Sequence, residues 1–305
     1  MTRYRIHPWP PLPPSVHWRA SQQTLPFPLE DPRCRLFARA RHALWQAVRS
    51  LGLRPGDQVL VPAYHHGSEV EALSRAGVEL RFYDVGETLE PDEASLEDST
   101  GPGVRALLLT HYMGFPQKSE RWRRWCDDRG LLLIEDAAQA WLATTSGTPV
   151  GALGDASVFC LYKSVGVPDG AAVICRSGVP PPRSGMPTGM AGLARRHVAW
   201  LEHRLLLRRT SLPPHWKYDP EADFALGDPY SPPTPATAAL LPRPADDRVA
   251  DRRRSNYRFL LQELSGAVTR SSLISLPARV RSWSRSTPSA NSTSSKDWPA
   301  EASWR

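Results

Sequence analysis

LIEDAAQAW, residues 133–141, runs from an apolar segment into two carboxylates, small residues and an amide. The apolar run 131–134 predicts a buried strand, so Glu135, Asp136 and Gln139 are expected just past its carboxyl end. Ligands of open α/β sheets bind at the carboxyl ends of the strands. The segment therefore predicts a ligand site. The alternative is that Asp136 caps a helix by accepting backbone N–H groups two or three residues later.

Helix and strand patterns alternate around this segment, between residues 36 and 176. Apolar residues at helical spacing predict helices over 36–53 and 68–75, and a charged stretch predicts a third over 119–129. Continuous apolar runs predict strands over residues 58–63, 78–83, 104–110 and 131–134. Strands without alternation, each reached through a helix, are typical of a mostly parallel sheet covered on both faces. The predicted fold class is α/β.

The chain of 305 residues, 41% of them hydrophobic, is long enough to bury a sizeable core. Its formal net charge is +7, and the excess of arginine lies mostly after residue 180, as in Arg195-Arg196 and Arg252-Arg253-Arg254. Because no nucleic-acid motif accompanies these charges, we interpret them as solvated helix faces or as contacts to an anionic substrate. No nucleic-acid partner is predicted.

The four cysteines are scattered without a CxxC pair or a zinc-ligand spacing, at positions 34, 126, 160 and 175. They are typical of a protein in a reducing compartment, and no metal site is predicted. The N-terminal sequence is too rich in proline for a signal peptide, and no apolar run reaches membrane-spanning length. The expected location is the cytoplasm, with no membrane partner.

Residues 151–174 place Lys163 in a loop between two apolar strands. Ordinarily such a lysine is a solvent-facing loop residue. An amine in a partly desolvated pocket instead loses its proton more easily and forms a Schiff base with a carbonyl carbon. With pyridoxal 5'-phosphate, a carboxylate pairs with the protonated ring nitrogen, and Asp136 has the chemistry for that role.

Five motifs, taken in order along the chain, resemble the DegT/DnrJ/EryC1/StrS family. They are PGDQVLVPA (55–63), HYMG (111–114), EDAAQA (135–140), GALGDA (151–156), and Lys163 before PDG (168–170). The family consists of fold-type I, pyridoxal-phosphate-dependent aminotransferases that act mainly on nucleotide-linked keto sugars. The resemblance implies a large domain with a mostly parallel sheet flanked by helices, a small C-terminal domain, and a homodimer.

The resemblance also implies roles for three residues at the predicted site. Lys163 would form the internal aldimine and later move a proton between the substrate carbon and the C4' carbon of the cofactor. Asp136 would pair with the pyridine nitrogen. Gln139 would bond the phenolic oxygen of the ring.

Other positions of the family pattern carry different residues here. Ala40, Arg41 and His42 match the phosphate-cradling turn at the start of the first helix, where the family usually has Ser-Gly-Thr. His66 falls at the position of the aromatic residue that stacks on the ring; the alternative is a capping or core histidine. Cys160 replaces the serine whose hydroxyl holds the cofactor phosphate, and a thiol is a weaker donor.

These patterns divide the chain into a proline-rich segment (1–35), a cofactor-binding large domain (36–178), connecting helices with the start of a C-terminal domain (179–270), and a tail (271–305). The small domain is therefore expected to be incomplete. The tail is rich in Ser, Arg, Trp and Pro, a composition that predicts disorder. One hypothesis is a frameshift, because a neighbouring frame of a back-translation of 282–304 can encode a strand followed by an amphipathic helix.

Two classes of function follow from the sequence. The first is an aminotransferase that moves an amino group from a glutamate-like donor to the keto group of a nucleotide-linked sugar or similar small ketone. The second is a degenerate, non-catalytic relative that keeps the fold to bind a ligand or partner. Cys160 and the shortened lysine loop favour the second. A dinucleotide-dependent oxidoreductase is disfavoured because no GxGxxG follows a predicted strand.

Overall fold

The computed structural model describes residues 10–183, 190–205, 224–245 and 248–264 of the chain. The predicted tail, 271–305, lies outside the described residues. The chain divides into two compact units, Met1–Asp251 and Arg252–Arg305, and helix α8 (Arg248–Leu264) runs from the first into the second. Among the described residues, no helix is both long enough and apolar enough to cross a membrane.

A seven-stranded sheet forms the centre of the first unit, with strand order β1-β9-β8-β5-β4-β2-β3. Its strands are β1 (Arg35–Phe37), β2 (Gln58–Pro62), β3 (Glu79–Tyr83), β4 (Val104–Thr110), β5 (Leu132–Asp136), β8 (Ala156–Cys160) and β9 (Ala171–Cys175). The pairs from β3 across to β8 are parallel, whereas β9 is antiparallel to both of its neighbours. The prediction of a mostly parallel sheet is confirmed. A short hairpin, β6 (Thr144–Thr145) with β7 (Thr148–Pro149), lies outside this sheet.

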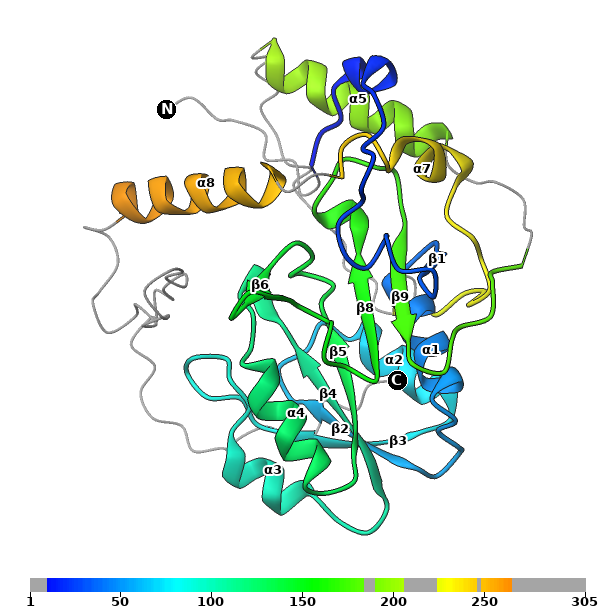
Figure 1. Cartoon of the computed structure of the whole chain (residues 1–305), viewed down its shortest axis with the longest axis vertical. Coiled ribbons are helices and arrows are strands. Elements are labelled where there is room, and N and C mark those ends of the chain that lie inside the picture. Colours follow the sequence, from blue (N-terminus) through cyan, green and yellow to red (C-terminus); the bar gives the residue numbers. More distant parts are fainter. Residues whose placement is uncertain (1–9, 184–189, 206–223, 246–247, 265–305) are drawn as a thin grey trace, which may run out of the picture. The chain divides into compact units, whose positions relative to one another are not determined.

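Helices cover both faces of the sheet (Figure 1). Helices α1 (Ala40–Ser50) and α2 (Ser68–Ala76) pack on one face, and α3 (Glu93–Ser99) and α4 (Ser119–Asp127) on the other. Alternate residues of one strand enter opposite cores: Ala106 and Leu108 of β4 contact the α1–α2 side, and Leu107 and Leu109 the α3–α4 side. This explains the continuous apolar runs, since side chains of a strand point alternately to its two faces.

The predicted helix over 36–53 is wrong at its start. Leu36 lies in β1, opposite Ala172 of β9, and α1 begins at Ala40. Leu36 packs in a core on one face of the sheet while Phe37 enters the core on the other face. Leu36 and Phe37 are apolar because they belong to an edge strand that packs on both faces, and this apolar pair was mistaken for the first turn of a helix.

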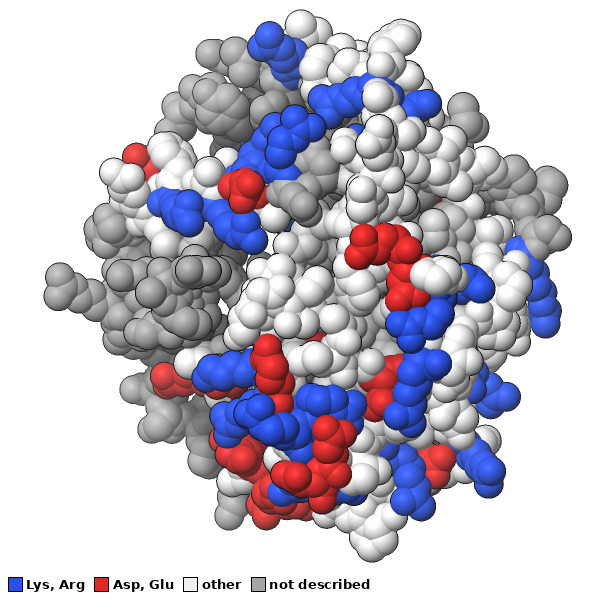
Figure 2. Space-filling view, viewed as in Figure 1, with Lys and Arg blue, Asp and Glu red and all other residues white. Residues whose placement is uncertain are grey.

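Charged side chains of both signs are interspersed over α3 and α4, in the lower part of Figure 2. Arg121 contacts Glu93 at 2.5 Å, and Arg129 contacts Glu97. The indoles of Trp122 and Trp125 are buried beneath these arginines. Arg121 and Arg129 therefore form ion pairs at the surface, and the two tryptophans beneath them are core residues.

From residue 10 onward, the N-terminal segment packs inside the first unit, of which it is a part. The turn η1 (Pro14–Trp18) places Val16, together with Leu12, against Leu193 of α5 (Met190–Arg204) and Leu240 of α7 (Pro235–Leu240). The backbone N–H of Leu12 donates to the Arg196 carbonyl at 3.3 Å. This part of the proline-rich segment thus joins α5 and α7 in a small core.

Candidate active site

The two carboxylates of the opening segment lie on opposite faces of β5. Both belong to the strand, which extends to Asp136, rather than following it as the sequence predicted. Ile134 contributes to the core beneath α1 and α2, so Asp136, two residues later, faces the same side. Glu135 faces α3 and α4. Asp136 can therefore take part in a ligand site, whereas Glu135 can stabilise the packing of the sheet against α3 and α4.

Glu135 is fully buried in a hydrogen-bond network. It accepts from Nε2 of His111 at 3.0 Å and from the Ser119 hydroxyl at 2.7 Å. His111 Nδ1 accepts the Gln117 backbone N–H, so its ring proton is on Nε2. Burial acts to raise the pKa of Glu135, but the hydrogen bonds from His111 and Ser119 lower it overall. Two backbone N–H groups of the following loop also donate to Glu135, those of Gly151 and Leu153.

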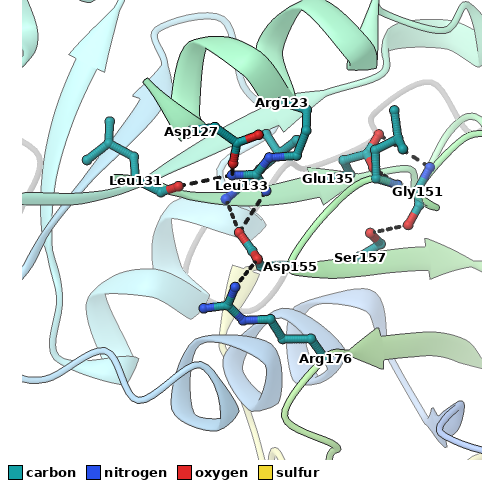
Figure 3. Close-up of polar contacts among 10 residues, drawn as sticks. Arg123, Asp127, Leu131, Leu133, Glu135, Gly151, Asp155, Ser157 and Arg176 are labelled. Carbon is teal, nitrogen blue, oxygen red and sulfur yellow. Dashed lines mark hydrogen bonds and ion pairs between the residues drawn. The ribbon is translucent and has the colours of Figure 1, made fainter. Parts of the chain in front are cut away.

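Asp155 forms a second buried anchor close by (Figure 3). Its carboxylate contacts Nη1 of Arg123 at 2.8 Å and Nη1 of Arg176 at 2.6 Å. It also accepts the Leu133 backbone N–H at 2.8 Å. The GALGDA motif therefore ties β5, α4 and the end of β9 together, because its acid receives groups from all three.

Replacing Glu135 with alanine is expected to lower the free energy of unfolding by about 3 kcal/mol, because buried donors lose their acceptor. Denaturant unfolding monitored by circular dichroism measures this change. The control is Glu93→Ala, which removes an exposed ion pair to Arg121 and should cost under about 1 kcal/mol. Equal losses in the two variants would contradict the anchoring role of Glu135.

Asp136 is 9% exposed and has an unusual electrostatic environment. Burial, followed by the Glu69 carboxylate of α2, raises its pKa to about 6. The Ala138 backbone N–H, at 2.9 Å from Oδ1, and the Lys163 ammonium act in the opposite direction. The contact with Ala138 is the one that the capping alternative predicted, although residues 138–142 form a turn and not a helix. The rest of the carboxylate remains available to a ligand.

Gln139 is oriented by a neighbouring backbone group. Its Oε1 accepts the Met113 N–H at 2.7 Å, so the side-chain NH₂ is the end left to donate. Met113 lies in the turn η2 (Tyr112–Gly114) at φ 55°, a left-handed conformation that is unusual for a residue with a side chain. Strained residues of this kind cluster at ligand sites.

Lys163 lies in the turn η3 (Leu161–Lys163), which directly follows β8. Strand β8 pairs with β5, with Val158 opposite Asp136, so the lysine turn and the aspartate come from the ends of neighbouring strands. Lys163 is close enough to lower the pKa values of both Asp136 and Cys160. The Cys160 thiol is fully buried, and this burial raises its pKa.

The remaining predicted residues lie around this centre. Ala40 and Arg41 begin α1, whose entry lies beside the lysine turn because the Gly170 N–H donates to the Ala38 carbonyl and the Leu161 N–H to the Gly170 carbonyl. His66 is exposed, and its ring contacts Phe224 edge-on, with 5.2 Å between centroids.

Sequence reasoning missed Glu69 and Tyr112. Glu69 accepts the His66 N–H at 2.8 Å and raises the pKa of Asp136. The Tyr112 hydroxyl donates to the Tyr64 carbonyl at 2.7 Å, and burial, followed by Asp136, raises its pKa. An acid in the first turn of a helix has an ordinary explanation in the helix dipole, so only the fold identifies Glu69 as a neighbour of the site.

The mostly parallel sheet, covered by helices on both faces, has the architecture of the large domain of fold-type I aminotransferases. Residues 34–178 of this chain match the model of the DegT/DnrJ/EryC1/StrS aminotransferase family. Among the described residues, no group of His, Cys, Asp and Glu side chains could hold a metal ion.

Two curated relatives illustrate the match. A dTDP-3-amino-3,4,6-trideoxy-alpha-D-glucose transaminase of Streptomyces venezuelae is 36% identical over 43% of this chain and 36% of its own length. A GDP-perosamine synthase of Vibrio cholerae is 29% identical over 45% of this chain and 38% of its own length. The match thus spans well under half of the length of these relatives.

Solved structures show the same fold. S. venezuelae DesV, in complex with a ketimine intermediate, has a TM-score of 0.51 and 28% identity, over 76% of this chain and 57% of DesV. 3-Amino-5-hydroxybenzoic acid synthase has a TM-score of 0.52 over 79% of this chain and 58% of its own, with 21% identity. The second likeness concerns the fold alone.

Proposed function

We propose that this chain is a pyridoxal-phosphate-dependent aminotransferase of the cytoplasm that works as a homodimer. It would move an amino group from a glutamate-like donor to the keto group of a nucleotide-linked sugar or similar small ketone. The observation that carries the proposal is the placement of a buried carboxylate, Asp136, beside Lys163 at the ends of neighbouring strands. The named activities of the relatives support the substrate class.

The residues present fit the cofactor. Asp136, with a pKa of about 6, is mostly ionised at neutral pH and offers a buried negative charge to a protonated ring nitrogen. Gln139 presents an NH₂ donor to the phenolic oxygen, because its carbonyl end is held by Met113. Lys163 supplies the amine. Bound pyridoxal phosphate would supply an electron sink for the reacting carbon.

Each side chain of the site would have a separate role toward the bound cofactor. Asp136 would hold the charged ring nitrogen of the bound cofactor and orient the ring. Lys163 would supply the amine that holds the cofactor and the group that carries the proton at the reacting carbon. His66 would cover the ring, and the first turn of α1, at Ala40 and Arg41, would face the phosphate. The network around Glu135 would hold β5, and therefore Asp136, in place.

The proposal is tested by adding glutamate to the protein loaded with pyridoxal phosphate. Transamination converts the visible absorbance band to that of the aminated cofactor and releases one 2-oxo acid per site. Cofactor binding without this conversion would instead support the second candidate, a non-catalytic domain. Cys160, buried at the position of the family's serine, is the observation that favours that candidate.

Replacing Gln139 with glutamate is expected to weaken binding of pyridoxal phosphate about tenfold. The carboxylate still accepts the Met113 N–H, so the turn is kept, but the donor to the phenolic oxygen is lost. Absorbance titration measures the affinity. Thermal unfolding should be nearly unchanged, and unchanged affinity would refute the assigned role of Gln139.

A further inference from the structure

The lysine turn carries a hydroxyl that the family pattern does not require. Tyr162 lies between Cys160 and Lys163, and its hydroxyl interacts with the Cys160 thiol and with the Arg39 guanidinium. Burial, followed by Cys160, raises the pKa of Tyr162, and Arg39 acts in the opposite direction. The phenol is therefore neutral at physiological pH and can donate a hydrogen bond.

Arg39 stands at the start of α1, next to this hydroxyl. It is the residue immediately before the helix, and its Cζ lies 5.9 Å from the centroid of the Tyr162 ring. Its side chain is largely exposed, so the guanidinium can turn toward an anion without a large loss of packing. A guanidinium offers several N–H donors in a planar arrangement that suits phosphate oxygens.

A second arginine, Arg196 of α5, reinforces the positive charge. Arg196 is a buried residue, 8% exposed, and its Nη1 donates to the Pro10 carbonyl at 3.4 Å. Burial, the largest cause, lowers the pKa of Arg196, and Tyr162 acts in the opposite direction. Lys163 acts to lower the pKa of the Cys160 thiol, so the turn that carries Tyr162 has cationic side chains near it from both Arg39 and Lys163.

We propose that Arg39 and the Tyr162 hydroxyl bind the phosphate group of the cofactor, in place of the serine hydroxyl that Cys160 has replaced. This inference rests on the proposed function. Arg196 adds positive charge near Tyr162, and the first turn of α1 supplies backbone N–H donors. In this arrangement the Cys160 thiol does not bind the phosphate. The buried thiol instead contacts the Tyr162 phenol and holds it in position.

The test compares pyridoxal phosphate with pyridoxal, which lacks the phosphate, by absorbance titration of the full chain. Arg39→Gln should weaken pyridoxal phosphate binding about tenfold, the loss expected for one charge-assisted hydrogen bond. Tyr162→Phe should weaken it severalfold. Binding of pyridoxal should change less than about twofold in either variant, since no phosphate contact is lost.

The matched control is Arg49→Gln at the other end of α1, whose Cζ also lies 5.9 Å from an aromatic centroid, that of Trp45. It should leave both affinities unchanged. Equal losses for the two ligands, or no loss, would overturn the phosphate role of Arg39 and Tyr162 while the wild type still binds the cofactor. A folded wild type that binds neither ligand would overturn the proposed function itself.

Discussion

Replacing Lys163 with arginine is expected to abolish attachment of pyridoxal phosphate and to slow transamination at least about 1000-fold. Arginine keeps the positive charge beside Asp136, so the electrostatic surroundings of the site change little. A guanidinium does not lose its proton in proteins, however, and cannot act as the attacking amine or carry the proton at the reacting carbon. Visible absorbance and release of 2-oxo acid from glutamate measure the two losses.

The control for this variant is Lys118→Arg. Lys118 precedes α4 and forms a surface ion pair with Glu90 at 3.0 Å, an interaction that arginine preserves. The control should keep the visible band and the transamination rate. A Lys163→Arg protein that retained both would show that the amine of another residue attaches the cofactor.

Replacing Asp136 with asparagine is expected to have two opposite effects. Above pH 6 the cofactor-free protein should gain about 2–3 kcal/mol in the free energy of unfolding. Its affinity for pyridoxal phosphate should fall about 100-fold, because the ring nitrogen loses a desolvated charge partner. Asparagine keeps an oxygen for the Ala138 N–H, so the turn is preserved.

The sign of the stability effect follows from the raised pKa. The carboxyl has an ordinary value of 3.8, which applies to the unfolded chain, and a value of about 6 in the fold. Between these values the folded state holds the proton more tightly, so stability falls as pH rises, and the full penalty is present above about pH 6. The gain from Asp136→Asn should therefore shrink toward zero near pH 4.

Denaturant unfolding at pH 4.5 and pH 8 measures this pattern. The control is Asp155→Asn, in the residue just before β8, which removes charge from the contacts to Arg123 and Arg176 and should destabilise the protein. Destabilisation by Asp136→Asn at pH 8 would contradict the assignment of Asp136 as a strained, ligand-directed carboxylate.

The sheet could be predicted from sequence because its central strands, β4, β5 and β8, are buried on both faces. Apolar runs such as 104–110 are diagnostic of such strands, and the helices between them require parallel pairing. The start of α1 could not be predicted in the same way. Leu36 and Phe37 are apolar because β1 pairs with β9, a contact between residues that are far apart in the chain.

The candidate site was predictable where its residues are local in sequence. The acidic segment after an apolar run identified Asp136 and Gln139, but the strand was assumed to end before Glu135. Had the strand been extended, its two-residue period would have separated Glu135 from Asp136. The proximity of Glu69 to Asp136, and of Arg196 to Tyr162, depends on tertiary packing and has no local signal in the sequence.

The most direct test of the proposed function is to map the lysine that holds the cofactor. The purified wild-type chain is mixed with pyridoxal phosphate, reduced with borohydride, digested and analysed by mass spectrometry. We predict a visible absorbance band before reduction and a single modified peptide that contains Lys163. Modification of Lys118 instead, or no modified lysine in a demonstrably folded sample, would contradict it.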